Sequence, residues 1–244
     1  LVGEFDDLLV AQDLLHDLEQ KGARAVVFTG AGATHFLGGA DGIEMMQLDR
    51  PGAREFSRRF QGLLDRLEAS PLLTVAAING LCFGGGFELA MACDLRVASS
   101  ASRIGLPEVK VGLIPGGGGT QRLPRLVGSG LAMEMILSGK LYSGEQAARM
   151  GLVHRMAPPE MLRQAVDDLL SPMLANPAHA IALAKLAVKA ALKSPLPEGL
   201  AVEAELFSQC HDHGFFRKLM QEQLRSGALT TTEDTAILLK ESAS

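Results

Sequence analysis

Short, almost continuously apolar segments alternate with helix-like segments through the first hundred residues, and no other feature limits the fold as strongly. The apolar segments span residues 25–29, 72–78 and 95–98. Strands that are apolar along their whole length are buried on both faces, as in a parallel sheet covered by helices. The sequence therefore predicts an α/β core with a mostly parallel sheet.

Helical periodicity places the remaining elements. Apolar residues at helical spacing predict helices ahead of the first strand and over 54–67, and a third helix is expected over about 87–93. Beyond residue 153 the strand signals fade, and helices are expected over 159–170, 177–192 and 198 to about 224. We expect a core over 1–158, a helical C-terminal region over 159–244, and a peripheral tail from Ser226 onward.

Composition excludes several classes of protein. The chain has 244 residues, 47% of them hydrophobic, and a formal net charge of −5, so neither a small core nor a nucleic-acid-binding face is expected. Its three cysteines are too scattered for a disulfide framework or a metal knuckle, and His211 and His213 lack a third ligand at usable spacing. No apolar stretch reaches the roughly 18 residues that span a bilayer. We expect a soluble, cytoplasmic protein without a metal ion.

Glycines concentrate in three runs, at 38–39, 84–86 and 116–119. The loop over 36–42 is expected to be too glycine-rich for a regular element. Each run lies where the chain enters a predicted helix, so bare N–H groups could hold an anion or a developing oxyanion. Tight turns alone would also explain each run. No P-loop lysine follows them, and none has the context of a dinucleotide site.

Two carboxylates lie among apolar neighbours close to these runs. Glu88 falls two residues after the second run, and Glu108 lies in Leu106-Pro107-Glu108-Val109, ahead of the third. Apolar surroundings raise the pKa of a carboxyl group, and two such groups beside main-chain donors could perform acid/base chemistry on a carbonyl derivative. The periodicity is also consistent with two glutamates that have no catalytic role. Glu88 would then be a carboxylate that interacts with a helix dipole, and Glu108 a solvated glutamate in a loop.

The chain contains Ile78-Asn79-Gly80-Leu81-Cys82-Phe83-Gly84-Gly85-Gly86-Phe87-Glu88, then Pro107-Glu108, and then Gly112-Leu113-Ile114-Pro115-Gly116-Gly117-Gly118-Gly119-Thr120-Gln121-Arg122-Leu123. Together these three segments resemble the crotonase (enoyl-CoA hydratase/isomerase) superfamily. Phe36-Leu37-Gly38-Gly39-Ala40-Asp41 is similar to the family's first oxyanion loop, and Ala148 to Val153 to a later marker. The resemblance implies a spiral of ββα turns and C-terminal helices that form a homotrimer, or a hexamer built from two trimers.

The same resemblance implies roles for residues. The N–H groups of Ala40 and Gly85 would bind the thioester oxygen, Glu88 and Glu108 would hold one water, and Gly116 would help to place it. Substrate contacts are expected at Gly39, Asp41, Gly84, Pro107 and Met45. The implied activity is an enoyl-CoA hydratase, a lyase that adds water across the 2,3-double bond of an acyl-CoA thioester without a cofactor, because coenzyme A is part of the substrate.

Alternatives remain open within the family. An enoyl-CoA isomerase needs only one base, and the two retained glutamates favour hydration over this or another crotonase reaction. The family's opening hairpin is not seen in the sequence. Gln221-Glu222-Gln223 occupies positions where the family often has a basic pair for coenzyme A. Arg217, Lys218 or Arg225 could replace that pair, or the acyl group could arrive on a carrier protein.

Overall fold

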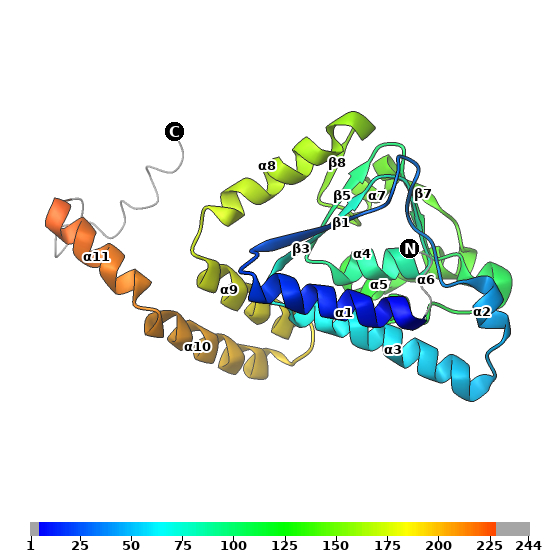
Figure 1. Ribbon diagram of the computed structural model, residues 1–244, viewed down its shortest axis with the longest axis horizontal. Helices are drawn as coiled ribbons and strands as arrows, with labels where there is room; N and C mark the ends of the chain where they lie inside the picture. The colour runs from blue at the N-terminus through cyan, green and yellow to red at the C-terminus, as the bar shows by residue number, and fades with distance from the viewer. Residues whose placement is uncertain (1–4, 228–244) are drawn as a thin grey trace. The chain divides into compact units, whose positions relative to one another are not determined.

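The computed structural model describes residues 5–227, and its side chains from Asp13 onward. It divides into two compact units, residues 1–176 and 177–244. The first unit holds most of the elements drawn in Figure 1. They are α1 (Phe5–Gln20), β1 (Ala25–Thr29), β2 (His35–Leu37), α2 (Gly42–Met46), α3 (Arg50–Ala69), β3 (Leu73–Ile78), β4 (Leu81–Phe83), α4 (Gly85–Ala92), β5 (Leu95–Ser99), β6 (Arg103–Gly105), α5 (Gly119–Val127), α6 (Ser129–Ser138), β7 (Tyr142–Ser143), α7 (Gly144–Arg149), β8 (Arg155–Ala157) and α8 (Leu162–Leu174), with 3₁₀ helices over Glu108–Val111 and Pro159–Met161.

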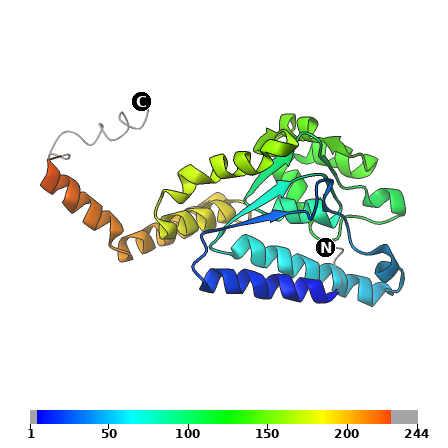
Figure 2. The same cartoon turned by 45° about the horizontal axis from the view of Figure 1, so that its top comes forward.

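Two four-stranded sheets form the frame of this unit. One has the order β1-β3-β5-β8 and is parallel throughout, and the other has the order β2-β4-β6-β7. In the second sheet only the β6–β7 pair is antiparallel. The predicted α/β class and mostly parallel pairing are confirmed. α1 and α3 run side by side below the first sheet, and α8 packs on β3, β5 and β8 at its other face (Figure 2).

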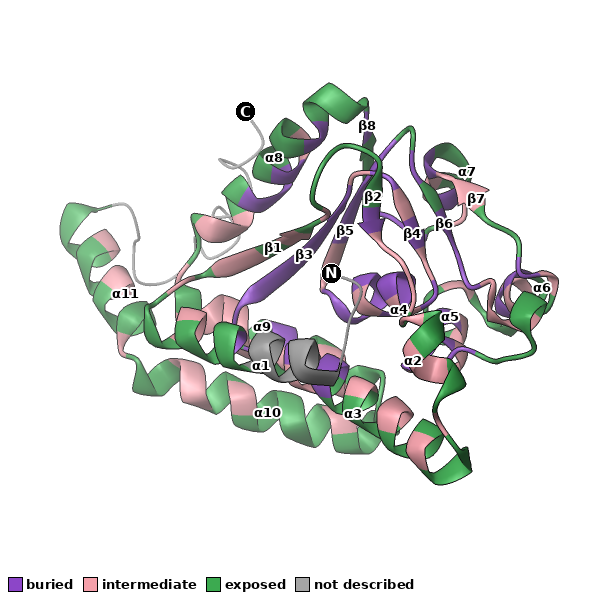
Figure 3. Cartoon of the chain, turned by 45° about the vertical axis from the view of Figure 1, so that its right-hand side comes forward, coloured by how far each residue is buried: buried purple, intermediate pink, exposed green. Residues whose placement is uncertain are grey.

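Helix α4 lies between the two sheets and contacts β2, β3 and β4. Most of its residues are buried, and so is every residue of β3 (Figure 3). Phe87, on α4, is fully buried and belongs to the same apolar core as Ile78 of β3 and Ile104 of β6. The core is therefore continuous from one sheet to the other through α4, and it fixes this helix in place.

The three predicted strands are confirmed as β1, β3 and β5, and the predicted 54–67 helix lies within the longer α3. α3 starts earlier because Asp49 caps it, accepting a hydrogen bond from Gly52 N–H at 2.8 Å. The prediction that no regular element lies in 36–42 was wrong, since β2 covers His35–Leu37 and α2 begins at Gly42. β2 is held by main-chain pairing with β4, which lies far along the chain.

The absence of strands after residue 153 was also wrongly predicted. β8 pairs with β5, yet Arg155 and Met156 are exposed, so the segment lacks an apolar pattern. The helix expected to start at Pro159 begins at Leu162, after a 3₁₀ turn. α8 packs with the first unit, so the compact units divide after Asn176, whereas the predicted boundary followed residue 158.

The second unit contains α9 (Ala178–Ala191), α10 (Leu196–Asp212) and α11 (Phe215–Ser226). The helix predicted over 177–192 is confirmed as α9. The single helix predicted from 198 to about 224 was wrong, because Gly214 adopts a left-handed φ of 66° and separates α10 from α11. Most of the predicted tail lies outside the described residues.

None of the three cysteines forms a disulfide, and Cys82 and Cys93 are buried. Within the described residues, no helix is both long and apolar enough to cross a lipid bilayer. The reducing, cytoplasmic location stays a prediction.

Candidate active site

Glu88 lies in the first turn of α4 and is only 2% exposed to solvent. The helix begins two residues earlier than predicted, at Gly85, and Gly84 precedes it with a φ of 55° that a side-chain-bearing residue rarely adopts. The second glycine run therefore forms the helix N-terminus itself. Its N–H groups and the positive end of the helix dipole lie beside Glu88.

The third glycine run holds the carboxylate of Glu88. Gly119 N–H donates a hydrogen bond to Glu88 Oε1 at 2.7 Å, and the N–H of Gly117 is a second donor. Burial raises the pKa of Glu88, while these two hydrogen bonds and the charge of Arg122 act in the opposite direction. Glu88 is thus a buried carboxyl group whose charged form has fixed partners.

Glu108 starts the 3₁₀ helix over Glu108–Val111, directly after Pro107. Burial raises the pKa of Glu108 to about 7; a hydrogen bond from its own backbone opposes the shift, and the charge of Glu88 adds to it. Its Oε2 is buried and has no hydrogen-bond partner among the described residues. The structure therefore places the two predicted carboxylates close enough for the charge of Glu88 to raise the pKa of Glu108.

The first glycine loop approaches the same place. A methyl group placed on Gly84 would lie 3.4 Å from Gly39 Cα and 3.3 Å from Glu108 Oε1. Gly86 N–H donates to Gly38 O at 2.9 Å, which ties the loop to the start of α4. Within the described part of the chain, the N–H groups of Ala40 and Gly85 donate no hydrogen bond. Neither of these donors is therefore satisfied by the described protein groups.

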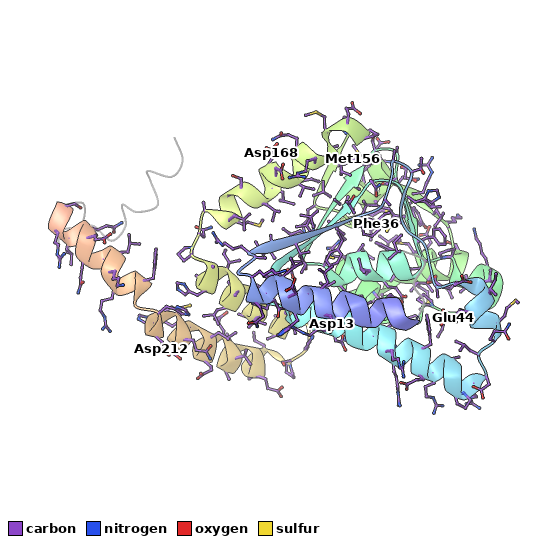
Figure 4. All side chains as sticks on the ribbon, in the orientation of Figure 1. Asp13, Phe36, Glu44, Met156, Asp168 and Asp212 are labelled. Atoms are coloured by element: carbon purple, nitrogen blue, oxygen red, sulfur yellow. The ribbon has the colours of Figure 1, made fainter. Side chains whose placement is uncertain are left out.

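The other predicted residues have varied surroundings. Asp41 caps α2 and accepts a hydrogen bond from Ile43 N–H at 2.7 Å. Met45 lies on α2 beside Glu44, which Figure 4 labels, and is half-buried. Gly116 is held through its carbonyl, which accepts from Ser57 Oγ at 2.7 Å and Gln61 Nε2 at 2.8 Å. The predicted water contact of Gly116 stays a prediction.

Sequence reasoning missed Gly117, Gly119, Phe60 and Arg122. A methyl group on Gly117 would lie 2.4 Å from the Phe60 ring and 2.7 Å from Glu88 Oε2, so the ring and the carboxylate meet at this glycine. The Phe60 ring also lies against Gly85. The available signal was a stripe at helical spacing on α3, which includes Ser57, Phe60 and Gln61. Only the fold shows that this stripe faces the third glycine run.

The fold, with two carboxylates close to the N-terminus of α4, is that of the crotonase class of enzymes. The family model for enoyl-CoA hydratase/isomerase matches residues 7–225. The chain belongs to this family, and its predicted membership of the crotonase superfamily is confirmed.

Relatives and solved structures agree with this assignment. The chain is 39% identical to the short-chain-enoyl-CoA hydratase of Clostridium acetobutylicum, over 76% of this chain and 71% of that protein. It is 36% identical to the crotonyl-CoA hydratase of Syntrophomonas wolfei, over 84% and 79%. The crystal structure of an enoyl-CoA hydratase from Bacillus anthracis superposes with a TM-score of 0.84 at 32% identity, covering 92% of this chain and 87% of that one. Pseudomonas aeruginosa DspI superposes with a TM-score of 0.85 at 34% identity, covering 92% and 86%.

Proposed function

We propose that the chain is an enoyl-CoA hydratase that adds water across the 2,3-double bond of an acyl-CoA thioester, giving the 3-hydroxyacyl product. The observation that carries this proposal is the pair of neighbouring carboxylates, buried Glu88 and half-buried Glu108, beside the N-terminus of α4. Two relatives named as hydratases support the same reaction class.

In the proposed reaction Glu88 is the base. Its ionised carboxylate, oriented by Gly119 N–H, removes a proton from water while the water oxygen bonds to C3. The electron pair of the double bond moves toward the thioester carbonyl and forms an enolate. Substrate contacts at Gly39, Asp41, Gly84, Pro107 and Met45, and placement of the water by Gly116 N–H, belong to this proposal.

Glu108 is the proposed acid. With a pKa of about 7, its carboxyl group is protonated in a substantial fraction of molecules at neutral pH and can deliver a proton to C2. The turnover leaves a proton on Glu88 and a charge on Glu108, so one proton must return to Glu108 before the next cycle. A pair that holds one proton between its members is suited to this exchange.

The N–H groups of Ala40 and Gly85 are the proposed oxyanion hole. Their lack of protein partners among the described residues and the approach of Gly39 to Gly85 support this role. A positioned donor that meets charge developing in the transition state contributes about 3 kcal/mol. The scheme uses only protein groups and needs no metal or redox cofactor, since coenzyme A enters with the substrate.

We also propose a homotrimer, or a hexamer of two trimers, assembled through the C-terminal unit. Its helices leave large apolar side chains exposed, including Val188 at 68% and Phe207 at 66%. An apolar surface of this kind is stabilised when a second copy of the chain covers it.

Loss of the enoyl absorbance of crotonyl-CoA tests the reaction. The wild-type protein should hydrate crotonyl-CoA, and Glu88→Gln should lower kcat by about 10²–10⁴-fold, the usual contribution of a general base. Glu145→Gln, an exposed change in α7, is the matched control and should keep full activity.

A 3-enoyl-CoA substrate distinguishes the isomerase alternative. The hydratase assignment would be contradicted if the protein turned over this substrate without hydrating crotonyl-CoA, and if the Glu88→Gln variant kept that isomerase activity.

A further inference from the structure

Arg122 lies in the first part of α5, and only 14% of its side chain is exposed. Its guanidinium has three different partners. Nε donates to Glu68 Oε1 at 2.9 Å and Nη2 to Asp65 Oδ1 at 2.9 Å, and both of these carboxylates belong to α3. Nη1 donates to Gly117 O at 2.7 Å. Arg122 therefore links the third glycine run to α3.

Three successive carbonyl groups of the third glycine run each accept a hydrogen bond. Gly116 O accepts from Ser57 and Gln61, Gly117 O accepts from Arg122 Nη1, and Gly118 O accepts from Arg122 N–H at 2.8 Å. Arg122 thus fixes two successive peptide groups, one with its side chain and one with its main chain.

A peptide group is planar and trans, so its N–H points away from its C=O. The peptide whose carbonyl is Gly116 O carries the N–H of Gly117, and the peptide whose carbonyl is Gly118 O carries the N–H of Gly119. These are the two N–H groups that hold Glu88. Between them lies the peptide that the Arg122 side chain anchors through Gly117 O.

We propose that Arg122 is a positioning residue for the hydration proposed above: its guanidinium clamps the glycine run to α3, which aims the N–H groups of Gly117 and Gly119 at Glu88. The proposal rests on the proposed role of Glu88 as the base. The charge of Arg122 also favours ionised Glu88. Loss of the clamp therefore weakens both the orientation of this base and the stability of its charged form.

The test compares Arg122→Met with Arg122→Lys and with Arg125→Met as the control. Arg125 lies on the same helix, is exposed, and donates to Gln121 O within α5. Arg122→Met should lower kcat by about 10–100-fold with KM changed less than threefold. The acidic limb of the pH profile of kcat/KM should move to higher pH, because Glu88 becomes harder to ionise.

Lysine keeps the charge but cannot supply three donors in a planar arrangement. Arg122→Lys should therefore fold, restore part of kcat, and move the acidic limb in the same direction by a smaller amount. Arg125→Met should behave as the wild type. An Arg122→Met or Arg122→Lys protein that keeps both wild-type kcat and the wild-type acidic limb would overturn the proposal.

A readout that does not depend on turnover separates this proposal from the function itself. Amide hydrogen exchange at Gly119, followed by NMR, should be at least tenfold faster in Arg122→Lys than in the wild type and unchanged in Arg125→Met. Unchanged exchange at Gly119 in Arg122→Lys would overturn the clamp. Faster exchange in a protein whose wild type hydrates no crotonyl-CoA would uphold the clamp and reject the proposed function.

Discussion

Glu88 and Glu108 both have raised pKa values, but the environments of their charged forms differ. Glu88 is almost fully buried, and two main-chain N–H groups stabilise its carboxylate. Glu108 is less buried, its Oε2 has no partner within the described part of the chain, and the charge of Glu88 opposes its ionisation. When the pair holds one proton, these environments favour the proton on Glu108 and the charge on Glu88.

The coupling gives a prediction with a definite sign. Glu88→Gln removes the negative charge that raises the pKa of Glu108, so Glu108 should ionise more readily and titrate below its wild-type value of about 7. The δ-carbon chemical shift of Glu108 measured by ¹³C NMR against pH reports this directly. In the Glu145→Gln control the titration should stay unchanged. A titration of Glu108 at the same pH or higher in Glu88→Gln would show that the two carboxyl groups are not coupled.

At the scale of elements, α4 is fixed at both ends. Its N-terminus meets β2 and the first glycine loop, where Gly86 N–H donates to Gly38 O. At its C-terminus the buried guanidinium of Arg96 donates to Ala90 O at 3.2 Å and Cys93 O at 3.0 Å. A cation at this end also interacts favourably with the helix dipole. The helix that carries Glu88 therefore has little freedom to shift.

Gly86→Ala tests how closely α4 must approach β2. A methyl group on Gly86 would lie 2.0 Å from Leu37 O, a main-chain atom that cannot move alone, so the helix N-terminus must separate from the strand. We expect a loss of about 1–3 kcal/mol in the free energy of unfolding. Hydration should fall at the same time, because the Gly85 N–H is displaced. Urea unfolding and crotonyl-CoA turnover measure the two effects.

Gly62→Ala is the matched control for this substitution. Gly62 lies within α3, and a methyl group there would meet nothing within 4 Å. Alanine in a helix interior is favoured over glycine by about 0.5–1 kcal/mol, so this variant should be slightly more stable and fully active. Equal stability of the Gly86→Ala variant and the wild type would contradict the close packing of α4 on β2.

At the scale of the whole molecule, the two units differ in how they bury apolar surface. The first unit has a continuous core through α4. Among the described residues of the second unit only Lys185 is buried, while Leu192, Leu196, Leu200 and Phe207 are exposed. Three helices with so little buried surface are expected to depend on further contacts for their stability.

Phe207→Glu tests the proposed assembly. The wild-type protein should have the mass of a trimer or a hexamer in light scattering coupled to gel filtration. The glutamate places a charge in the proposed apolar contact and should shift the population to smaller species. Glu203→Gln, an exposed change one turn earlier in α10, should leave the mass unchanged. A monomeric wild-type protein at micromolar concentration would reject the trimer.

The sequence by itself determined the α/β class, the strands β1, β3 and β5, and the identity of the two acidic residues as candidates. Continuous apolar runs and glycine runs are local patterns, and a strand buried on both faces must be apolar wherever it lies. The short strands β2 and β8 lack such a pattern because they contain exposed residues, and only their pairing with β4 and β5 makes them strands.

Only the tertiary structure decided which groups surround Glu88. The pKa of a carboxyl group depends on its burial and its neighbours in space, and here these come from α3, α4 and the third glycine run together. The contact between Arg122 and Gly117 O, and the approach of Phe60 to Gly117, depend on how α3 packs against that run. Packing between distant segments is a property of the folded chain as a whole, so no local pattern in the sequence could reveal it.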